Sequence, residues 1–310
     1  MKYKIAILFS FFGFAALHAQ QEAMYTHYMY NTLGVNPAYA GSRDALTVTA
    51  LHRSQWVGFE GAPHTQTLTL HLPVYADAVN LGLSIINDII GPVHSTAVYI
   101  DYAFRFKLTK SINMSLGLKA GFNNYNFNLS KLQINDSNDP AFMINDGAFS
   151  PNIGFGVYVS HEKFYAGLST PKIFENNYAY SLPKNNLSKE KMHLYFIAGG
   201  IIPINNDLKI KPTGLVKFVP GAPIEFDLTA NFLLYDRFLL GAMYRTGDAV
   251  GLLVGYHITE QFSAGYSFDW SFVNFTGKYN GGSHEIVLCY DFIFKERKKV
   301  IRSPRYFSNF

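Results

Sequence analysis

Hydrophobic and polar residues alternate along most of the chain from Asp44 onward, a pattern that predicts β-strands with two different faces. In residues 97–108, one face carries Val98, Ile100, Tyr102, Phe104, Phe106 and Leu108. The other face carries Ala97, Tyr99, Asp101, Ala103, Arg105 and Lys107. Residues 112–123 repeat this alternation after Thr109-Lys110, so the pair predicts two antiparallel strands joined by a tight turn.

The same pattern continued along the chain predicts fourteen strands. Their expected ranges are 44–54, 64–72, 78–87, 95–108, 111–124, 150–160, 162–170, 191–202, 207–218, 223–234, 237–246, 249–258, 261–271 and 284–295. Most of these strands are long enough to cross a bilayer at a tilt. An even number of strands is what a closed antiparallel barrel in a bacterial outer membrane requires. The predicted fold is therefore an all-β transmembrane barrel.

The connections between the predicted strands alternate in length. Those after even-numbered strands are short: 73–77, 109–110, 161, 203–206, 235–236 and 259–260. Several after odd-numbered strands are long: 55–63, 88–94, 125–149, 171–190 and 272–283. Two others after odd-numbered strands, 219–222 and 247–248, are short. Outer-membrane barrels have short periplasmic turns and longer external loops, so this alternation predicts that both chain termini are periplasmic.

Composition supports a membrane location. Only 15% of the residues are charged and 16% are aromatic, so something other than water must solvate much of the surface. After the N-terminal leader, no segment offers the roughly 18 consecutive apolar residues that a membrane-spanning helix needs. The net charge of +4 falls to +2 without Lys2 and Lys4 (24 basic minus 22 acidic residues), which does not suggest nucleic-acid binding.

The first 19 residues are predicted to be a secretory signal peptide. Lys2 and Lys4 precede an apolar core over 5–17, and small residues lead up to a cleavage site after Ala19. The expected organisation is then a periplasmic N-terminal segment or plug over 20–43, a barrel over 44–295, and a basic periplasmic tail over 296–310. The single cysteine, Cys289, cannot form an internal disulfide.

No catalytic motif is present, and we expect neither enzymatic activity nor a bound cofactor or metal. The stretch His161-Glu162-Lys163-Phe164-Tyr165 begins like a zinc-protease helix, but it ends in tyrosine and falls at a strand turn. Charges of both signs lie on the predicted lumen face, at Asp101, Arg105, Lys119, Glu225, Asp227, Arg245, Asp269 and Asp291. Such charges can pair across the interior, which favours a partly filled barrel over a wide channel of one charge sign.

Two stretches at the start of the mature chain are distinctive. The first is rich in tyrosine, includes Tyr28 and Tyr30, and ends in Asn36-Pro37-Ala38-Tyr39-Ala40-Gly41. So many tyrosines are unusual for disorder, so this stretch is expected to pack in the lumen or against a periplasmic partner. The second joins the first two strands and contains Arg53-Ser54-Gln55-Trp56 followed by Gly61-Ala62-Pro63, whose glycines and proline predict a defined loop.

These blocks resemble the N-terminal hallmarks of the PorP/SprF family of outer-membrane proteins. The blocks Gly281-Gly282-Ser283-His284-Glu285-Ile286 and Arg302-Ser303-Pro304-Arg305 are similar to the closing region of that family. The resemblance spans the whole mature chain, and in the middle it rests on the strand pattern. It implies a barrel that works with the type IX secretion machinery and gliding motility of Bacteroidetes. Some members serve the core translocon, while others support export or surface attachment of partners such as adhesins.

The leading hypothesis is a non-enzymatic secretion accessory that contacts outer-membrane lipid, type IX components and a secreted or surface-anchored protein. Loops 125–149 and 171–190 would face that protein, and the basic tail with Lys298, Arg302 and Arg305 would dock an acidic periplasmic partner. The candidate partner-binding residues are Tyr28, Tyr30, Asn36, Pro37, Tyr39, Gly41, Arg53, Trp56, Lys298, Arg302 and Arg305. One alternative is an outer-membrane transporter or channel for small or hydrophobic solutes. A barrel-embedded lipid hydrolase is a third reading, but the outer wall offers no convincing Ser/His pair.

Overall fold

The computed structural model describes residues 22–75, 77–128, 146–176, 190–272 and 281–293. Two short helical turns, α2 (Thr32–Val35) and η1 (Pro37–Tyr39), precede the strands. The strands are β1 (Leu46–Ser54), β2 (His64–Tyr75), β3 (Val79–Ile90), β4 (Val93–Lys107), β5 (Asn113–Phe127), β6 (Asp146–Ser160), β7 (Phe164–Thr170), β8 (Leu194–Gly200), β9 (Ile202–Pro203), β10 (Leu208–Phe218), β11 (Glu225–Leu234), β12 (Phe238–Arg245), β13 (Ala249–His257), β14 (Phe262–Ser271) and β15 (Ser283–Phe292).

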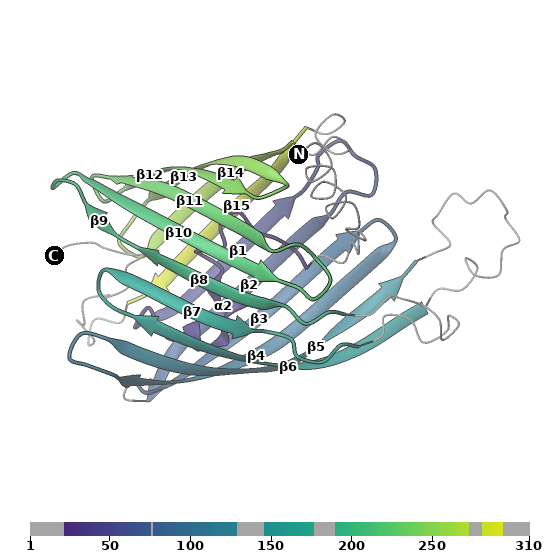
Figure 1. Ribbon diagram of the computed structural model, residues 1–310, viewed down its shortest axis with the longest axis horizontal. Helices are drawn as coiled ribbons and strands as arrows, with labels where there is room; N and C mark the ends of the chain where they lie inside the picture. Colours follow the sequence, from purple (N-terminus) through teal and green to yellow (C-terminus); the bar gives the residue numbers. More distant parts are fainter. Residues whose placement is uncertain (1–21, 76, 129–145, 177–189, 273–280, 294–310) are drawn as a thin grey trace, which may run out of the picture.

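The strands form one closed antiparallel sheet (Figure 1). Each strand pairs with its neighbours in the sequence, and β15 pairs with β1 to join the two ends of the chain of strands. The two-residue β9 follows β8 after an interruption at Ile201, and both pair with β10. Counted as one, they make a barrel of fourteen strands, which confirms the predicted fold class.

Alternating residues face opposite sides of the barrel wall, as the sequence pattern predicts. On β4, Ile100 is 61% exposed while the next residue, Asp101, is completely buried. On β13, Leu252 is 66% exposed and its neighbour Leu253 is buried. The outward face is dominated by leucine, isoleucine, valine and aromatic side chains, as membrane contact requires. The inward face carries polar and charged side chains that are buried inside the barrel.

Two hairpins are longer than the alternation predicts. The strand β3 extends to Ile90 and β4 begins at Val93, so most of the expected loop 88–94 is strand. Likewise, β5 continues to Phe127 and β6 begins at Asp146, inside the expected loop 125–149. The added positions that face outward on these hairpins include His94 and Asn126. Because these outward residues are polar, hydrophobic and polar positions no longer alternate, and the predicted strands end before the observed ones.

The two ends of the barrel can be told apart by their connections. The turn end carries the short turns 108–112, 161–163, 235–237 and 258–261, together with the start of β1 and the end of β15. The loop end carries the first loop, 55–63, and the connections 91–92, 219–224 and 246–248. Within the described part of the chain, no helix is long and apolar enough to cross a membrane.

Candidate functional site: an N-terminal segment inside the barrel

Residues 22–45, which we call the lumen segment, run through the barrel from its loop end to its turn end. Figure 1 shows the helix α2 of this segment inside the ring of strands. At the loop end, Glu22 contacts Lys172, just after β7, and Tyr195, near the start of β8. At the turn end, Asp44 pairs with Arg105 near the end of β4. The start of β1 and the end of β15 lie at the turn end, whereas Glu22, the first described residue, lies at the loop end.

The block 36–41 forms a compact turn at the wall of the barrel. The side-chain oxygen of Asn36 accepts a hydrogen bond from the Ala38 amide at 3.0 Å and so caps the 3₁₀ helix η1. Pro37 occupies the first position of this helix, where its missing amide hydrogen is not needed. The Asn36 amide nitrogen donates to the carbonyl oxygen of Val157 on β6 at 3.0 Å. One side chain therefore shapes the turn and attaches it to the barrel.

Glycines in the barrel wall make room for this turn. A Cβ atom at Gly117 on β5 would lie 2.1 Å from the Ala38 amide nitrogen and 2.5 Å from the Pro37 carbonyl carbon. A Cβ atom at Gly156 on β6 would lie 2.1 Å from the Asn36 side-chain oxygen. The backbones of wall and segment therefore approach more closely than any larger residue at Gly117 allows.

The end of the block packs between aromatic and polar side chains of the wall. The ring of Tyr39 makes edge-to-face contacts with His71, at 5.3 Å between centroids, and with Tyr158, at 5.5 Å. Gly41 has a φ of +69°, and a Cβ atom there would overlap the Asn80 side chain at 2.0 Å. Both its backbone conformation and its surroundings favour glycine at this position.

Two ion pairs fix the turn-end part of the lumen segment. Arg43 pairs with the buried Asp291 near the end of β15. Asp44 accepts a hydrogen bond from Arg105 at 2.6 Å, and the same guanidinium donates to the carbonyl oxygens of Gly41 and Asp77. These contacts tie the segment to the strands β4 and β15 immediately before it enters β1.

A buried ionic cluster fixes the segment nearer the loop end. Arg53 on β1 lies 2.6 Å from Asp269 on β14 and 3.2 Å from Glu285 on β15. The Thr26 hydroxyl contacts both carboxylate oxygens of Asp269, at 2.7 and 2.6 Å. Glu285 accepts from the backbone amides of Thr26 and His27 and lies 2.9 Å from the His27 ring nitrogen. The cluster joins three strands to the lumen segment.

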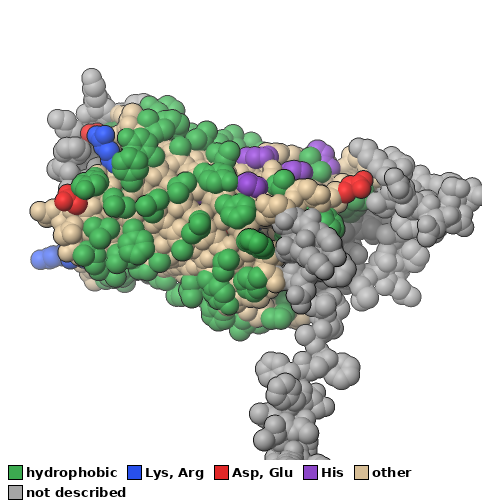
Figure 2. All heavy atoms as spheres, turned by 90° about the horizontal axis from the view of Figure 1, so that it is seen from above, with side chains coloured by type: hydrophobic (Ala, Val, Ile, Leu, Met, Phe, Trp, Pro, Cys, Tyr) green, Lys and Arg blue, Asp and Glu red, His purple; other side chains and the backbone are tan. Residues whose placement is uncertain are grey.

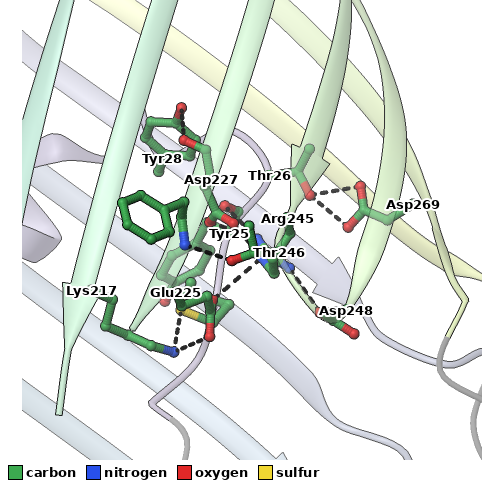
Figure 3. A network of polar contacts seen from close by, with 12 residues as sticks. Tyr25, Thr26, Tyr28, Lys217, Glu225, Asp227, Arg245, Thr246, Asp248 and Asp269 are labelled. Carbon is green, nitrogen blue, oxygen red and sulfur yellow. Dashed lines mark hydrogen bonds and ion pairs between the residues drawn. The ribbon is translucent and has the colours of Figure 1, made fainter. Parts of the chain in front are cut away.

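A second ionic cluster lies on the strands β10, β11 and β12 (Figure 3). Arg245 on β12 lies 2.8 Å from Asp227 and 3.6 Å from Glu225, both on β11. Lys217 on β10 pairs with Glu225 at 2.9 Å. The Arg245 guanidinium also donates to the carbonyl oxygen of Tyr25 at 3.4 Å. The lumen segment is thus bonded to this cluster as well as to the one around Arg53.

At the loop end, Glu22 forms a separate polar contact. Its carboxylate lies 2.9 Å from the Lys172 ammonium group and accepts a hydrogen bond from the Tyr195 hydroxyl at 3.2 Å. Burial raises the pKa of the Glu22 carboxyl, but the charges of Lys172 and His193 and the hydrogen bonds from Lys172 and Tyr195 outweigh it and lower the pKa to about 2. The ion pair therefore holds the described start of the chain at the loop end.

The first loop, 55–63, is attached to the start of β15. The Trp56 amide donates to the Ser283 hydroxyl at 3.3 Å, and Trp56 has a φ of +50°. The Val57 amide donates to Gly282, and the Gly281 amide donates back to Val57 at 2.6 Å. Two further side chains of the loop project outward, since Val57 is 40% and Phe59 is 48% exposed. The loop is therefore held by its backbone while apolar side chains face outward.

The contacts of the lumen segment join parts of this chain to one another. In the ranges the structure describes, no group of three or more His, Cys, Asp and Glu side chains is placed to hold a metal ion. The buried carboxylates Asp269 and Glu285 are each occupied by partners from the lumen segment and β1.

Residues 17–290 match the family described as type IX secretion system membrane protein PorP/SprF. The chain belongs to the PorP/SprF family. As a member, it is a membrane protein of the type IX system with an outer-membrane β-barrel fold. None of the curated proteins matches the chain.

Several solved outer-membrane barrels are similar in shape to this PorP/SprF protein. The CymD monoaromatic hydrocarbon channel has 10% identity and a TM-score of 0.48, with 86% of this chain and 93% of that one covered. The outer membrane protein Omp33 of Acinetobacter baumannii has 9% identity and a TM-score of 0.47, with 81% and 100% covered. A FadL homologue of Pseudomonas aeruginosa has 13% identity and a TM-score of 0.46, with 83% and 93% covered.

The structure brings the family's N-terminal and C-terminal blocks together. Arg53 and Glu285, which belong to blocks more than 200 residues apart in the sequence, are direct neighbours on β1 and β15. Trp56 lies beside Ser283, in the same C-terminal block. Within the lumen segment, Tyr28 is buried and its hydroxyl donates to Thr213 at 3.0 Å.

The remaining candidates divide into two groups. Tyr30 is partly buried and packs edge-to-face on His27, while Asn36, Pro37, Tyr39 and Gly41 lie in the turn described above. Most of these residues contact this chain's own barrel, so their described environment is internal. Lys298, Arg302 and Arg305 lie outside the described residues, as does most of the loops 125–149 and 171–190.

Sequence reasoning did not assign the partners of the lumen segment. Thr26, His27 and Arg43 bind wall carboxylates and Gly117 makes room for the segment, but the sequence pattern singles out none of them. The lumen face was predicted to carry Asp227, Arg245, Asp269 and Asp291, among other charges. An excess of acids among them was the signal that basic groups elsewhere in the chain must reach into the lumen.

Proposed function

We propose that this protein acts as a mount in the outer membrane, through protein contacts at the two ends of its barrel. It would support export or surface attachment of partner proteins, such as adhesins, together with other type IX components. The observation that supports this role is the lumen segment, which is bonded to opposite walls and to both ends of the interior. Because the lumen segment occupies the interior, partner proteins would bind at the ends of the barrel and at its loops. We propose that the role is not enzymatic.

We further propose that the turn end faces the periplasm, because short turns lie on that side in outer-membrane barrels. The end of β15 would then deliver the basic tail, 296–310, to the periplasm. The first loop, with exposed Val57 and Phe59, would face the outside together with loops 125–149 and 171–190. In this orientation Glu22 would lie near the outer surface, so the proposal departs from the expectation that both chain termini are periplasmic.

The tail carries the proposed periplasmic contact. Residues 295–310 contain six basic residues and one acid, Glu296. Such a segment is suited to an acidic surface, and electrostatic attraction of this kind accelerates and orients association.

Crosslinking in cells followed by purification of the tagged protein tests this proposal. We expect the wild type to recover type IX components or a large surface protein. The triple change Lys298→Glu, Arg302→Glu and Arg305→Glu should reduce that recovery and the secretion of the partner, while the barrel remains inserted. The matched control is Lys107→Glu with Lys110→Glu, which places the same type of charge change on exposed lysines at the same barrel end.

Equal recovery and equal secretion by the tail variant would contradict docking through the tail. If the wild type recovers no secretion component, the proposed role through protein contacts is contradicted. A channel for small or hydrophobic solutes would instead require the lumen segment to leave the interior, or a path beside it.

A further inference from the structure

The outer wall of the barrel carries a band of polar side chains near the loop end of β1–β4. We call it the polar band; its members are His52, Ser54, His64, Gln66, Asn87, His94 and Thr96. Residues 52, 66, 87 and 96 are direct partners across four adjacent strands. Each member is exposed or partly exposed, while inward neighbours such as Arg53 and Thr65 are buried. The band therefore faces away from the lumen, on the side of the wall that contacts the membrane.

The members of the band form a continuous network of hydrogen bonds. Asn87 donates to Gln66 at 2.7 Å and lies 2.6 Å from a ring nitrogen of His94. Gln66 in turn lies 3.4 Å from His52, and the Ser54 hydroxyl contacts His52 at 3.1 Å and His64 at 3.2 Å. These bonds hold the side chains side by side across the strands, so the band is an ordered surface.

Apolar surface begins directly below the band, toward the turn end. The next outward row on the same four strands is Ala50, Leu68, Ile85 and Val98. Figure 2 shows histidine side chains gathered near one end of the barrel, next to a wall with many hydrophobic side chains. This face presents hydrogen-bonding groups above apolar side chains. It therefore complements an amphiphilic molecule, which has a polar headgroup and an apolar tail.

The chemistry of the band disfavours a phosphate group. None of its seven members is a lysine or an arginine, the residues that usually supply fixed positive charge and donor groups to phosphates. None is an acid either, so a cationic headgroup gains no ion pair here. Amides, hydroxyls and imidazoles offer both donors and acceptors, which suits the hydroxyl groups of a sugar.

The size of the band disfavours a protein partner. Four strands spaced about 4.8 Å apart make it roughly 15 to 20 Å wide, and two outward rows make it roughly 7 to 10 Å high. Its area is then roughly 100 to 200 Å², whereas a stable protein interface covers about 800 Å² on each partner. An area of this size matches one or two sugar rings.

We propose that the polar band binds the uncharged saccharide headgroup of a membrane glycolipid, whose acyl chains cover the apolar row below. If the loop end faces outward, as proposed above, this glycolipid lies in the outer leaflet; the rest of the proposal does not depend on that orientation. The hairpin β3–β4 supplies Asn87, His94 and Thr96, and of these His94 lies in the part that extends beyond the predicted strands.

Native mass spectrometry of the full-length mature protein in detergent can test this assignment. The probes are a monoglycosyl diacylglycerol, a phosphatidylethanolamine and a phosphatidylglycerol with the same acyl chains. We expect the wild type to bind the glycolipid about tenfold more tightly than either phospholipid, the effect of one or two net hydrogen bonds. The triple change His52→Leu, Gln66→Leu and Asn87→Leu should abolish that preference, and Gln66→Leu alone should reduce it.

The control is His161→Leu, which removes a histidine at the turn end, and it should keep the preference. Heat-modifiable migration on a gel shows that each variant is folded. Equal binding of the three lipids by the wild type, or an unchanged preference in the triple variant, would overturn the proposal. Stronger binding of phosphatidylglycerol would assign the band to phosphates, and a dimer lost in the triple variant would assign it to a second copy; both results would also overturn it. None of these lipid-binding results affects the crosslinking test of the proposed function.

Discussion

At Gly117 the backbones of the barrel wall and the lumen segment approach each other more closely than a Cβ atom would permit. The atoms that a Cβ would meet belong to the backbones of Pro37 and Ala38, so a rotamer change cannot relieve the overlap. The Asn36 cap and its bond to Val157 hold that turn in place. The fit of the segment to the wall therefore depends on the absence of one side chain.

Gly117→Ala is expected to lower the free energy of unfolding by about 1 to 3 kcal/mol, the usual cost of overfilling a packed site. Urea titration in detergent micelles measures it. Gly214→Ala on β10 is the matched control, since the nearest atom to a Cβ there is Leu228 Cδ2 at 3.5 Å. Similar losses in both variants would show that the close approach at Gly117 has no special cost.

Arg53 is the residue that compensates two buried carboxylates at once. Arg53→Ala leaves Asp269 and Glu285 without their guanidinium partner, and breaking a buried pair in this way costs about 3 to 5 kcal/mol. Adding Glu285→Gln to Arg53→Ala removes one uncompensated charge and should restore part of the loss. The same urea titration reads both effects, and a loss below about 1 kcal/mol for Arg53→Ala would contradict the role of the cluster.

At the scale of the element, the lumen segment is held at each end by charge. Glu22 is bound at the loop end, Thr26 and His27 at the cluster around Arg53, and Arg43 and Asp44 at the turn end. The helical turns between them have four and three residues, too short to be stable alone. The segment takes its conformation from the wall.

Acid should release the loop-end contact of this segment. The folded pKa of Glu22, about 2, is below the ordinary value of 4.5, so the carboxylate stabilises the fold above pH 4.5 and loses that contribution as the pH falls toward 2. The stability difference between wild type and Glu22→Gln should be on the order of 2 kcal/mol at pH 6 and vanish near pH 2. Urea titrations at several pH values measure it, and a difference that does not change with pH would contradict the ion pair.

The strands were predictable from the sequence because period-two alternation needs only local information. The pattern at 97–108 places Ile100 outward and Asp101 inward, as observed. It failed at His94 and Asn126, where outward residues are polar and the two faces look alike. The path of the lumen segment was not predictable, because it depends on pairings such as Thr26 with Asp269 and Arg43 with Asp291, across more than 240 residues.

At the scale of the whole molecule, the barrel and the segment inside it form one packed unit. Strand pairing closes the wall between β15 and β1, and the segment that fills the interior continues directly into β1. Both buried clusters bind this segment, one through Thr26 and His27 and the other through the carbonyl oxygen of Tyr25. On this account the inside of the barrel serves stability, and contacts with other proteins are made at its ends.

Conductance of the purified protein in planar lipid bilayers tests whether the lumen segment blocks the barrel. Insertion of the wild type should give no stable current steps, because the lumen segment occupies the path. A variant lacking residues 22–43 that still folds should give steps, which shows that insertion can be detected. Stable open-channel currents from the wild type, of the same size as those from the truncated variant, would contradict the account.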